Sequence, residues 1–177
     1  MADGESSLGA INAADDATAA RLIVPFIERS PMVAARVARR RPFAGPEALA
    51  EAVRAEIEAL DPDELIALLG GHPELAPGAP EAMTAHSQEE QGRLGVAVPT
   101  GDARARIADL NRRYREKFGF PFVVALVRHK DLDTVIANFA TRLDATAEEE
   151  METARGEIAA VSRARIMAAL DHAAGGR

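Results

Sequence analysis

The chain has 177 residues, of which 47% are hydrophobic and only 4% aromatic, and its formal net charge is −7. This length and apolar content exclude a disordered chain and predict one domain, residues 1–177, around a sizeable core. The acidic balance argues against nucleic acid or an anionic membrane as a partner, and the absence of cysteine excludes disulfides, thiolate catalysis and cysteine-ligated zinc.

The first sixty residues predict amphipathic helices separated by prolines. Asn12 is a plausible N-cap, and Pro25 should kink or end the helix that follows. Ser30-Pro31 resembles an N-cap followed by a proline in the first turn; Pro42 closes that helix and Gly45-Pro46 precedes the next. The expected buried positions are Ala19, Leu22, Ile23, Phe26, Leu49, Val53, Ile57 and Leu60.

The middle of the chain predicts two helices, an irregular stretch and a further strong helix. Asp61-Pro62-Asp63-Glu64 starts a helix that should end at Gly70-Gly71. Residues 72–84 are rich in proline, glycine and alanine and should be irregular. A helix is expected to resume near Ser87, and another to run from Asp102 to Gly119.

The last third contains the only strand-like run, Phe120–Val127, which has no second run to pair with and is expected to be a buried irregular segment or a helix start. Asp131 should begin a helix. Thr146 and Glu149 form a capping box for the last helix, which should reach about His172. The sequence therefore predicts an all-α, single-domain bundle of about seven to nine helices with one irregular segment.

No export or membrane segment is expected. Residues 1–5 are acidic and lack the apolar region of a signal peptide, and no apolar stretch approaches the ~20 residues that a membrane span requires. We expect a cytoplasmic protein.

The four histidines are the first candidates for chemistry. None of them shows the spacing of a helical metal site, so a metal enzyme is not supported. His129 and His172 are interpreted as surface residues. His72 follows a glycine pair and precedes a proline that restricts its backbone, so its side chain could point in a fixed direction. A functional and a structural role for His72 both stay open.

Two further segments allow both a structural and a functional interpretation. Ser87 and Glu90 are spaced as a capping box, which we favour, although a helix N-terminus also attracts small anions. The segment Phe118–Phe122 is expected in the core. Because this segment lies outside any sheet, its backbone N–H groups could bind a ligand beside an apolar wall.

Taken in order, these segments resemble the 2-oxo-4-hydroxy-4-carboxy-5-ureidoimidazoline (OHCU) decarboxylase family. The matching motifs are His72-Pro73-x-Leu75-Ala76, Ser87-x-x-Glu90-Gln91, and Leu110-Asn111-x-x-Tyr114-x-x-x-Phe118-Gly119-Phe120-Pro121-Phe122, together with Ser30-Pro31, Arg41-Pro42-Phe43, Arg142-Leu143, Glu157-Ile158 and Arg165-Ile166. Each piece is weak by itself, but the ordered set covers nearly the whole chain.

The resemblance implies an all-α homodimer, without metal or organic cofactor, that decarboxylates OHCU to S-allantoin in the last step from urate. It implies that His72 is the catalytic acid/base and Glu90 its partner. The residues implied to shape the substrate pocket are Pro73, Ser87, Gln88, Glu89 and Gln91. The residues implied to bind the polar edge of the ring through their backbone are Phe122, Val123, Val124, Ala125 and Leu126.

Arg165 is implied to hold an anionic or carbonyl group of this ureidoimidazoline substrate, with Arg163 and Arg142 as further candidates. The sequence departs from the family at Met32, where many relatives have tryptophan, and at His86, where an acidic residue is common. Two other functions stay open. They are a non-catalytic helical interaction module on the same scaffold and a related lyase acting on another ureido acid.

Overall fold

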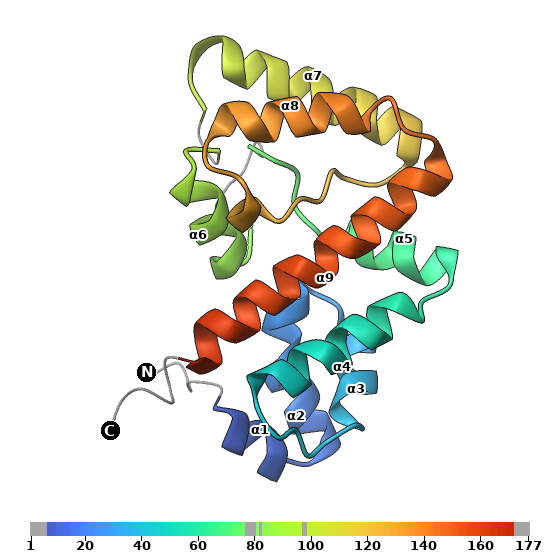
Figure 1. Cartoon of the computed structure of the whole chain (residues 1–177), viewed down its shortest axis with the longest axis vertical. Coiled ribbons are helices and arrows are strands. Elements are labelled where there is room, and N and C mark those ends of the chain that lie inside the picture. Colours follow the sequence, from blue (N-terminus) through green and yellow to red (C-terminus); the bar gives the residue numbers. More distant parts are fainter. Residues whose placement is uncertain (1–6, 77–80, 82, 97–98, 172–177) are drawn as a thin grey trace. The chain divides into compact units, whose positions relative to one another are not determined.

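The described part of the chain is helical apart from turns and irregular loops. The computed structural model describes residues 7–76, 81, 83–96 and 99–171, and these residues form nine α-helices and no strand (Figure 1). The predicted all-α fold of seven to nine helices is confirmed. The described residues divide into two compact units, one from residues up to 61 and from 159 onward, the other from residues 62–158.

The first unit is built from the N-terminal helices and the last part of the C-terminal helix. Its elements are α1 (Leu8–Ala13), α2 (Asp16–Ile23), the 3₁₀ helix η1 (Val24–Ile27), α3 (Pro31–Ala38), α4 (Pro46–Glu58) and residues 159–171 of α9 (Ala147–Asp171). The predicted starts at Pro31 and Pro46 are confirmed, and Pro25 lies where α2 tightens into η1.

Asn12 is not an N-cap, so that prediction was wrong. Ser7 caps the short helix α1, in which Asn12 lies, and Asp15 caps α2 by accepting the N–H of Thr18 at 2.8 Å. The Asn12 amide instead pairs with the backbone of Phe43, donating to its carbonyl and accepting its N–H, each at 2.9 Å. A six-residue helix carries too little periodicity to be predicted.

The second unit holds the segments with candidate chemistry apart from Arg163 and Arg165. Its elements are α5 (Pro62–Gly70), α6 (Ala85–Arg93), α7 (Gly101–Phe118), η3 (Leu126–Arg128), α8 (Leu132–Arg142) and residues 147–158 of α9. Several predicted boundaries are confirmed. Asp131 caps α8, Thr146 and Glu149 form the capping box of α9, and Gly119 ends α7 with a φ of 80° that favours glycine.

The predicted capping box at Ser87 and Glu90 was wrong. Thr84 is the N-cap of α6, and its hydroxyl accepts the N–H of Ser87 at 3.3 Å, which places Ser87 in the first turn. Thr84 and Ser87, three positions apart, are both residue types that can cap a helix, and the sequence pattern predicted Ser87.

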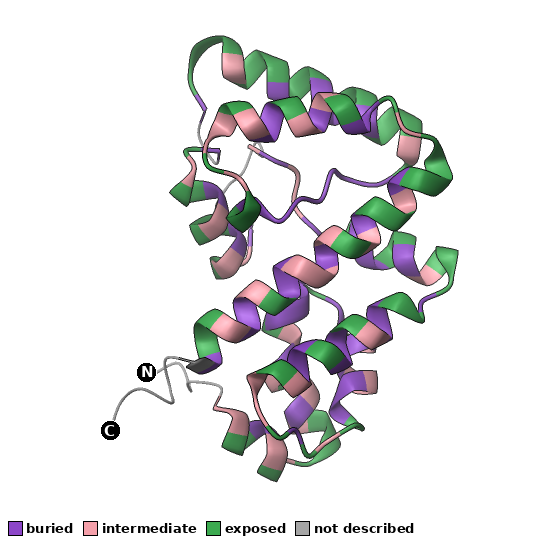
Figure 2. Cartoon of the chain, in the orientation of Figure 1, coloured by how far each residue is buried: buried purple, intermediate pink, exposed green. Residues whose placement is uncertain are grey.

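An aromatic cluster around Tyr114 forms much of the core of the second unit. The Tyr114 ring lies edge-on to Phe120, Phe122 and Phe139, with centroid distances of 5.4–5.8 Å, and Phe122 stacks on Phe139. The chain from Phe120 to Leu126 is buried without forming a strand, as predicted (Figure 2). In the described ranges, no helix combines the length and apolar content needed to cross a membrane.

Candidate active site

His72 is fixed by the end of helix α5. Its N–H donates to the Leu69 carbonyl at 3.0 Å, and its ring Nδ1 lies 3.3 Å from the Leu68 carbonyl oxygen. Because a carbonyl oxygen only accepts, this contact favours the ring proton on Nδ1 and leaves the lone pair of the neutral ring on Nε2. The residue is 9% exposed, so the ring is held in one direction.

The loop after His72 is bound to helices α6 and α7 through its backbone. The Gln91 amide donates to the Glu74 carbonyl and accepts the N–H of Ala76, both at 2.9 Å. Asn111 on α7 donates to the Leu75 carbonyl at 2.8 Å. Ala76 has a φ of 49°, which is unusual for a residue with a Cβ, so this paired amide holds a strained turn in place.

Helix α6 also contacts the irregular segment 122–126. Arg93, at the end of α6, donates to the Leu126 carbonyl at 2.9 Å. One helix is therefore hydrogen-bonded to both segments that carry predicted site residues, through Gln91 on one side and Arg93 on the other. The structure thus brings together the loop after His72, the helix containing Glu90 and the segment 122–126.

The first two turns of α6 present their predicted site residues differently. Ser87 and Gln91, four positions apart, are buried, while Gln88 and Glu89 are exposed and Glu90 is half-buried. The Gln88 side chain donates to the Met83 carbonyl at 3.1 Å. The burial pattern is that of a helix with one packed face, from Ser87 to Gln91, and an exposed adjacent face.

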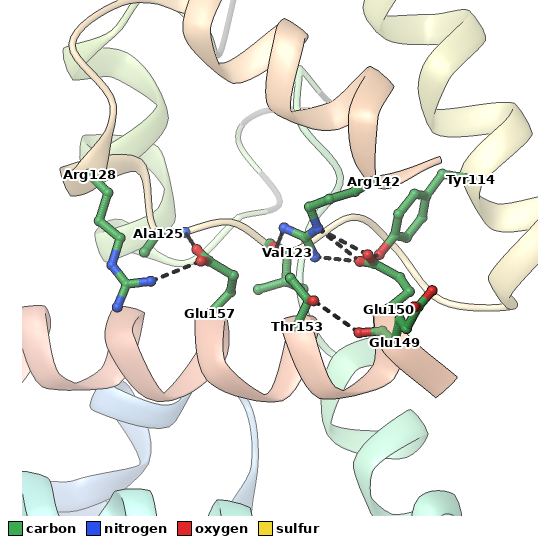
Figure 3. A network of polar contacts seen from close by, with 9 residues as sticks. All are labelled: Tyr114, Val123, Ala125, Arg128, Arg142, Glu149, Glu150, Thr153 and Glu157. Carbon is green, nitrogen blue, oxygen red and sulfur yellow. Dashed lines mark hydrogen bonds and ion pairs between the residues drawn. The ribbon is translucent and has the colours of Figure 1, made fainter. Parts of the chain in front are cut away.

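Two charged side chains anchor the segment 122–126. Arg142 donates to the Val123 carbonyl at 2.9 Å, and the Glu157 carboxylate accepts the N–H of Ala125 at 2.6 Å (Figure 3). The second oxygen of Glu157 pairs with Arg128 at 2.9 Å. The Ala125 N–H is therefore paired within the protein, in a segment that the family resemblance implies to bind the substrate through its backbone.

A buried ionic cluster supports the Arg142 contact. Arg142 pairs with Glu150, which is fully buried, and the Tyr114 hydroxyl donates to the same carboxylate (Figure 3). The guanidinium also lies 4.4 Å from the centre of the Phe122 ring, a cation–π contact. Burial, and then the hydrogen bond to Glu150, raise the pKa of Tyr114, so the phenol stays protonated.

The three arginines considered for substrate contact have different surroundings. Arg142 pairs with Glu150 and the Val123 carbonyl, as described above. Arg163 is about half-exposed and pairs with Glu47. Arg165, in the first unit, is 3% exposed and pairs with the equally buried Glu28 at 2.7 Å. A substrate role for Arg165 stays a prediction.

Four of the remaining predicted residues have intermediate exposure. Pro73, Met32, His86 and His129 are half-buried, and His172 lies outside the described residues. Within the described ranges, no group of three or more histidine, aspartate or glutamate side chains is arranged to hold a metal ion.

Asn111 and Glu157 occur in the motifs that resemble the family, but neither they nor Arg93 were predicted to hold this region. Asn111 had a usable signal, because it is a polar residue on the apolar face of α7 beside Leu110. No local pattern around Arg93 or Glu157 indicates their contacts with the segment 122–126, since the backbone atoms that they bind lie 33 and 32 residues away.

Comparisons with known proteins agree with one another. A sequence model of the OHCU decarboxylase family matches residues 12–167. The 2-oxo-4-hydroxy-4-carboxy-5-ureidoimidazoline decarboxylase of Mus musculus is 40% identical over 143 residues, which cover 80% of each chain. The protein of the same name from Haloferax volcanii is 31% identical over 162 residues, covering 92% of this chain and 95% of its own.

A solved structure shows the same fold. The crystal structure of an OHCU decarboxylase in the presence of (S)-allantoin covers 88% of this chain and 97% of that chain, with a TM-score of 0.69 and 16% identity. The likeness at this identity concerns the fold alone. The family match spans most of the sequence, and the chain belongs to the OHCU decarboxylase family.

Proposed function

We propose that this chain is a carbon–carbon lyase that decarboxylates OHCU to S-allantoin in urate degradation. The observation that carries the proposal is the double attachment of α6, through Gln91 to the loop after His72 and through Arg93 to the segment 122–126. Family membership and the names of the relatives support the same reaction.

The reaction needs orientation and one proton. When the carbon–carbon bond to the carboxylate breaks, CO2 leaves and the electron pair stays on the heterocycle, where the ring can delocalise it. The protein must orient the carboxylate, stabilise the developing anion and protonate one face of the ring. We assign the proton transfer to His72 Nε2, since Nδ1 faces the Leu68 carbonyl, and we assign Glu90 as its partner.

The other predicted residues complete the proposed site. The residues proposed to shape the pocket are Pro73, Ser87, Gln88, Glu89 and Gln91, and those proposed to bind the ring edge through backbone groups are Phe122, Val123, Val124 and Leu126. Ala125 is proposed to line the site without donating its N–H, because that N–H donates to Glu157. Arg165 is proposed for the anionic group on the family resemblance alone. We further propose that residues 1–177 act as one domain in a cytoplasmic, cofactor-free homodimer.

The test is optical, because OHCU decays by itself to racemic allantoin. Freshly generated OHCU is followed by circular dichroism with and without protein, and the wild-type chain is expected to accelerate decay and yield S-allantoin. His72→Ala and Glu90→Ala should abolish this acceleration while keeping the helical far-UV spectrum. A racemic product at the spontaneous rate from the wild-type chain would refute the lyase and point to a non-catalytic scaffold.

A further inference from the structure

Two residues of the segment 122–126, Phe122 and Val124, have no backbone hydrogen bond among the described residues, and only Val124 has a held peptide group on each side, at the Val123 carbonyl and the Ala125 N–H. Among the described residues, partners are found for the carbonyls of Val123 and Leu126 and for the N–H of Ala125, whereas no hydrogen bond reaches the N–H or carbonyl of Val124. Val124 is nevertheless buried. Buried backbone groups in native proteins are nearly always paired, so an omitted donor and acceptor side by side mark a place where a ligand supplies the partners.

The two anchors fix the directions of these two groups. In a trans peptide the C=O and N–H of one plane point in opposite directions. The peptide plane between Val123 and Val124 is held by Arg142 at its carbonyl, so its N–H points away from Arg142. The plane between Val124 and Ala125 is held by Glu157 at its N–H, so its carbonyl points away from Glu157.

Both anchors suit this task because they are charged and held by further contacts. Hydrogen bonds to charged groups are about twice as strong as neutral ones. Arg142 is buried against Glu150, and the Glu157 side chain is 17% exposed with its second oxygen on Arg128. Each anchor is thus held by a second charged partner, which restrains the part of the segment that it contacts.

We infer that Arg142 and Glu157 are positioning residues that orient the Val124 N–H and carbonyl as a donor–acceptor pair for the ureidoimidazoline ring. This inference rests on the proposed function and deepens it. A ring edge with one C=O and one N–H offers the complementary pattern, so Val124 reads the substrate while the two side chains keep Val124 in place. Neither Arg142 nor Glu157 touches the reacting atoms.

Glu157 provides the sharper test, because Arg142 also supports the core. Three variants are compared with the wild type in the optical assay: Glu157→Ala, Glu157→Gln and, as a control, Glu116→Gln. Glu116 is an exposed glutamate on α7 that pairs with Arg112. The alanine variant loses the acceptor, whereas the glutamine variant keeps a neutral one in the same place.

The expected result is a rise in KM with little change in kcat. The ring edge is bound alike in the substrate and in the transition state, so Glu157→Ala should raise KM roughly tenfold and lower kcat by less than about threefold. Glu157→Gln should restore most of this loss, and Glu116→Gln should match the wild type. The pH profile of kcat should stay unchanged in all three variants, because His72 is untouched.

Two outcomes would overturn the inference. One is a wild-type KM in Glu157→Ala. The other is an equal loss of kcat in the alanine and glutamine variants together with an equal drop in urea midpoint, which would show a purely structural role. The rate and product configuration of the wild-type chain test the proposed lyase, whereas the Glu157 variants test only the positioning role. Failure of the proposed function is therefore distinguishable from failure of this inference.

Discussion

At the scale of single residues, the orientation of His72 is the feature that matters for chemistry. A histidine in a flexible loop can carry its proton on either ring nitrogen, and its ring can point in many directions. Here the Leu68 carbonyl at 3.3 Å selects the tautomer, and the turn at the end of α5 holds the backbone. The residue thus presents Nε2 alone to its surroundings.

Replacing His72 with asparagine separates orientation from proton transfer. The asparagine amide nitrogen lies near the position of Nδ1 and can still donate to the Leu68 carbonyl, so the turn should survive. The atom that carries the proton is absent, and kcat should fall by about 10²–10⁴-fold, the usual contribution of a general acid or base.

The optical assay measures this loss, with His129→Asn as the control on a histidine outside the proposed site. A His72→Asn variant with wild-type kcat would show that another group protonates the ring.

At the scale of elements, helix α6 is the connecting piece, and its role was only partly predictable. Helix starts at Pro31, Pro46 and Asp131 were predicted because caps and prolines act within a few residues. The start of α6 was misplaced because Thr84 and Ser87 are both competent caps. Nothing local in the sequence signals that the Gln91 amide pairs with backbone groups 15 and 17 residues away.

Gln91→Met tests whether this amide holds the loop. Methionine fills a similar volume but leaves the Glu74 carbonyl and the Ala76 N–H without their partner, so stability should fall by about 2 kcal/mol. Gln91→Glu should be intermediate at neutral pH, since a carboxylate accepts from Ala76 but cannot donate to Glu74.

Urea denaturation followed by far-UV circular dichroism gives both values, with Arg113→Gln as an exposed control on α7. Equal stability of Gln91→Met and wild type would mean that the strained turn at Ala76 needs no support from α6.

At the scale of the whole molecule, a buried ion pair is found among the described residues of each compact unit. Glu28 and Arg165 pair in the first unit, and Glu150 and Arg142 in the second. The sequence could predict the helices that carry Arg142, Glu150 and Arg165, because apolar periodicity is local, whereas Glu28 lies in the turn after η1. It could not predict the pairs, since a charged residue on a helix is usually solvated and Glu28 lies 137 residues from Arg165.

The pair in the second unit, Arg142 and Glu150, allows a prediction of what a buried ion pair contributes to stability. Arg142→Met leaves the Glu150 carboxylate buried with only the Tyr114 hydroxyl, and an uncompensated buried charge typically costs about 3–5 kcal/mol. In the double variant Arg142→Met/Glu150→Leu both charges are absent, so most of that loss should be recovered. The remainder reflects the Val123 carbonyl and the Tyr114 hydroxyl, which lose their partners.

Urea denaturation of wild type, single and double variants measures this coupling directly. A double variant as unstable as Arg142→Met would contradict the prediction and locate the loss in the Val123 contact rather than in the buried charge. The stability result also has a consequence for activity.

If the uncompensated charge of Glu150 causes most of the lost stability, the double variant should fold well. It has still lost an anchor of the segment 122–126, so its KM should stay high although its stability returns. Stability and substrate binding would then depend on different contacts of the same arginine.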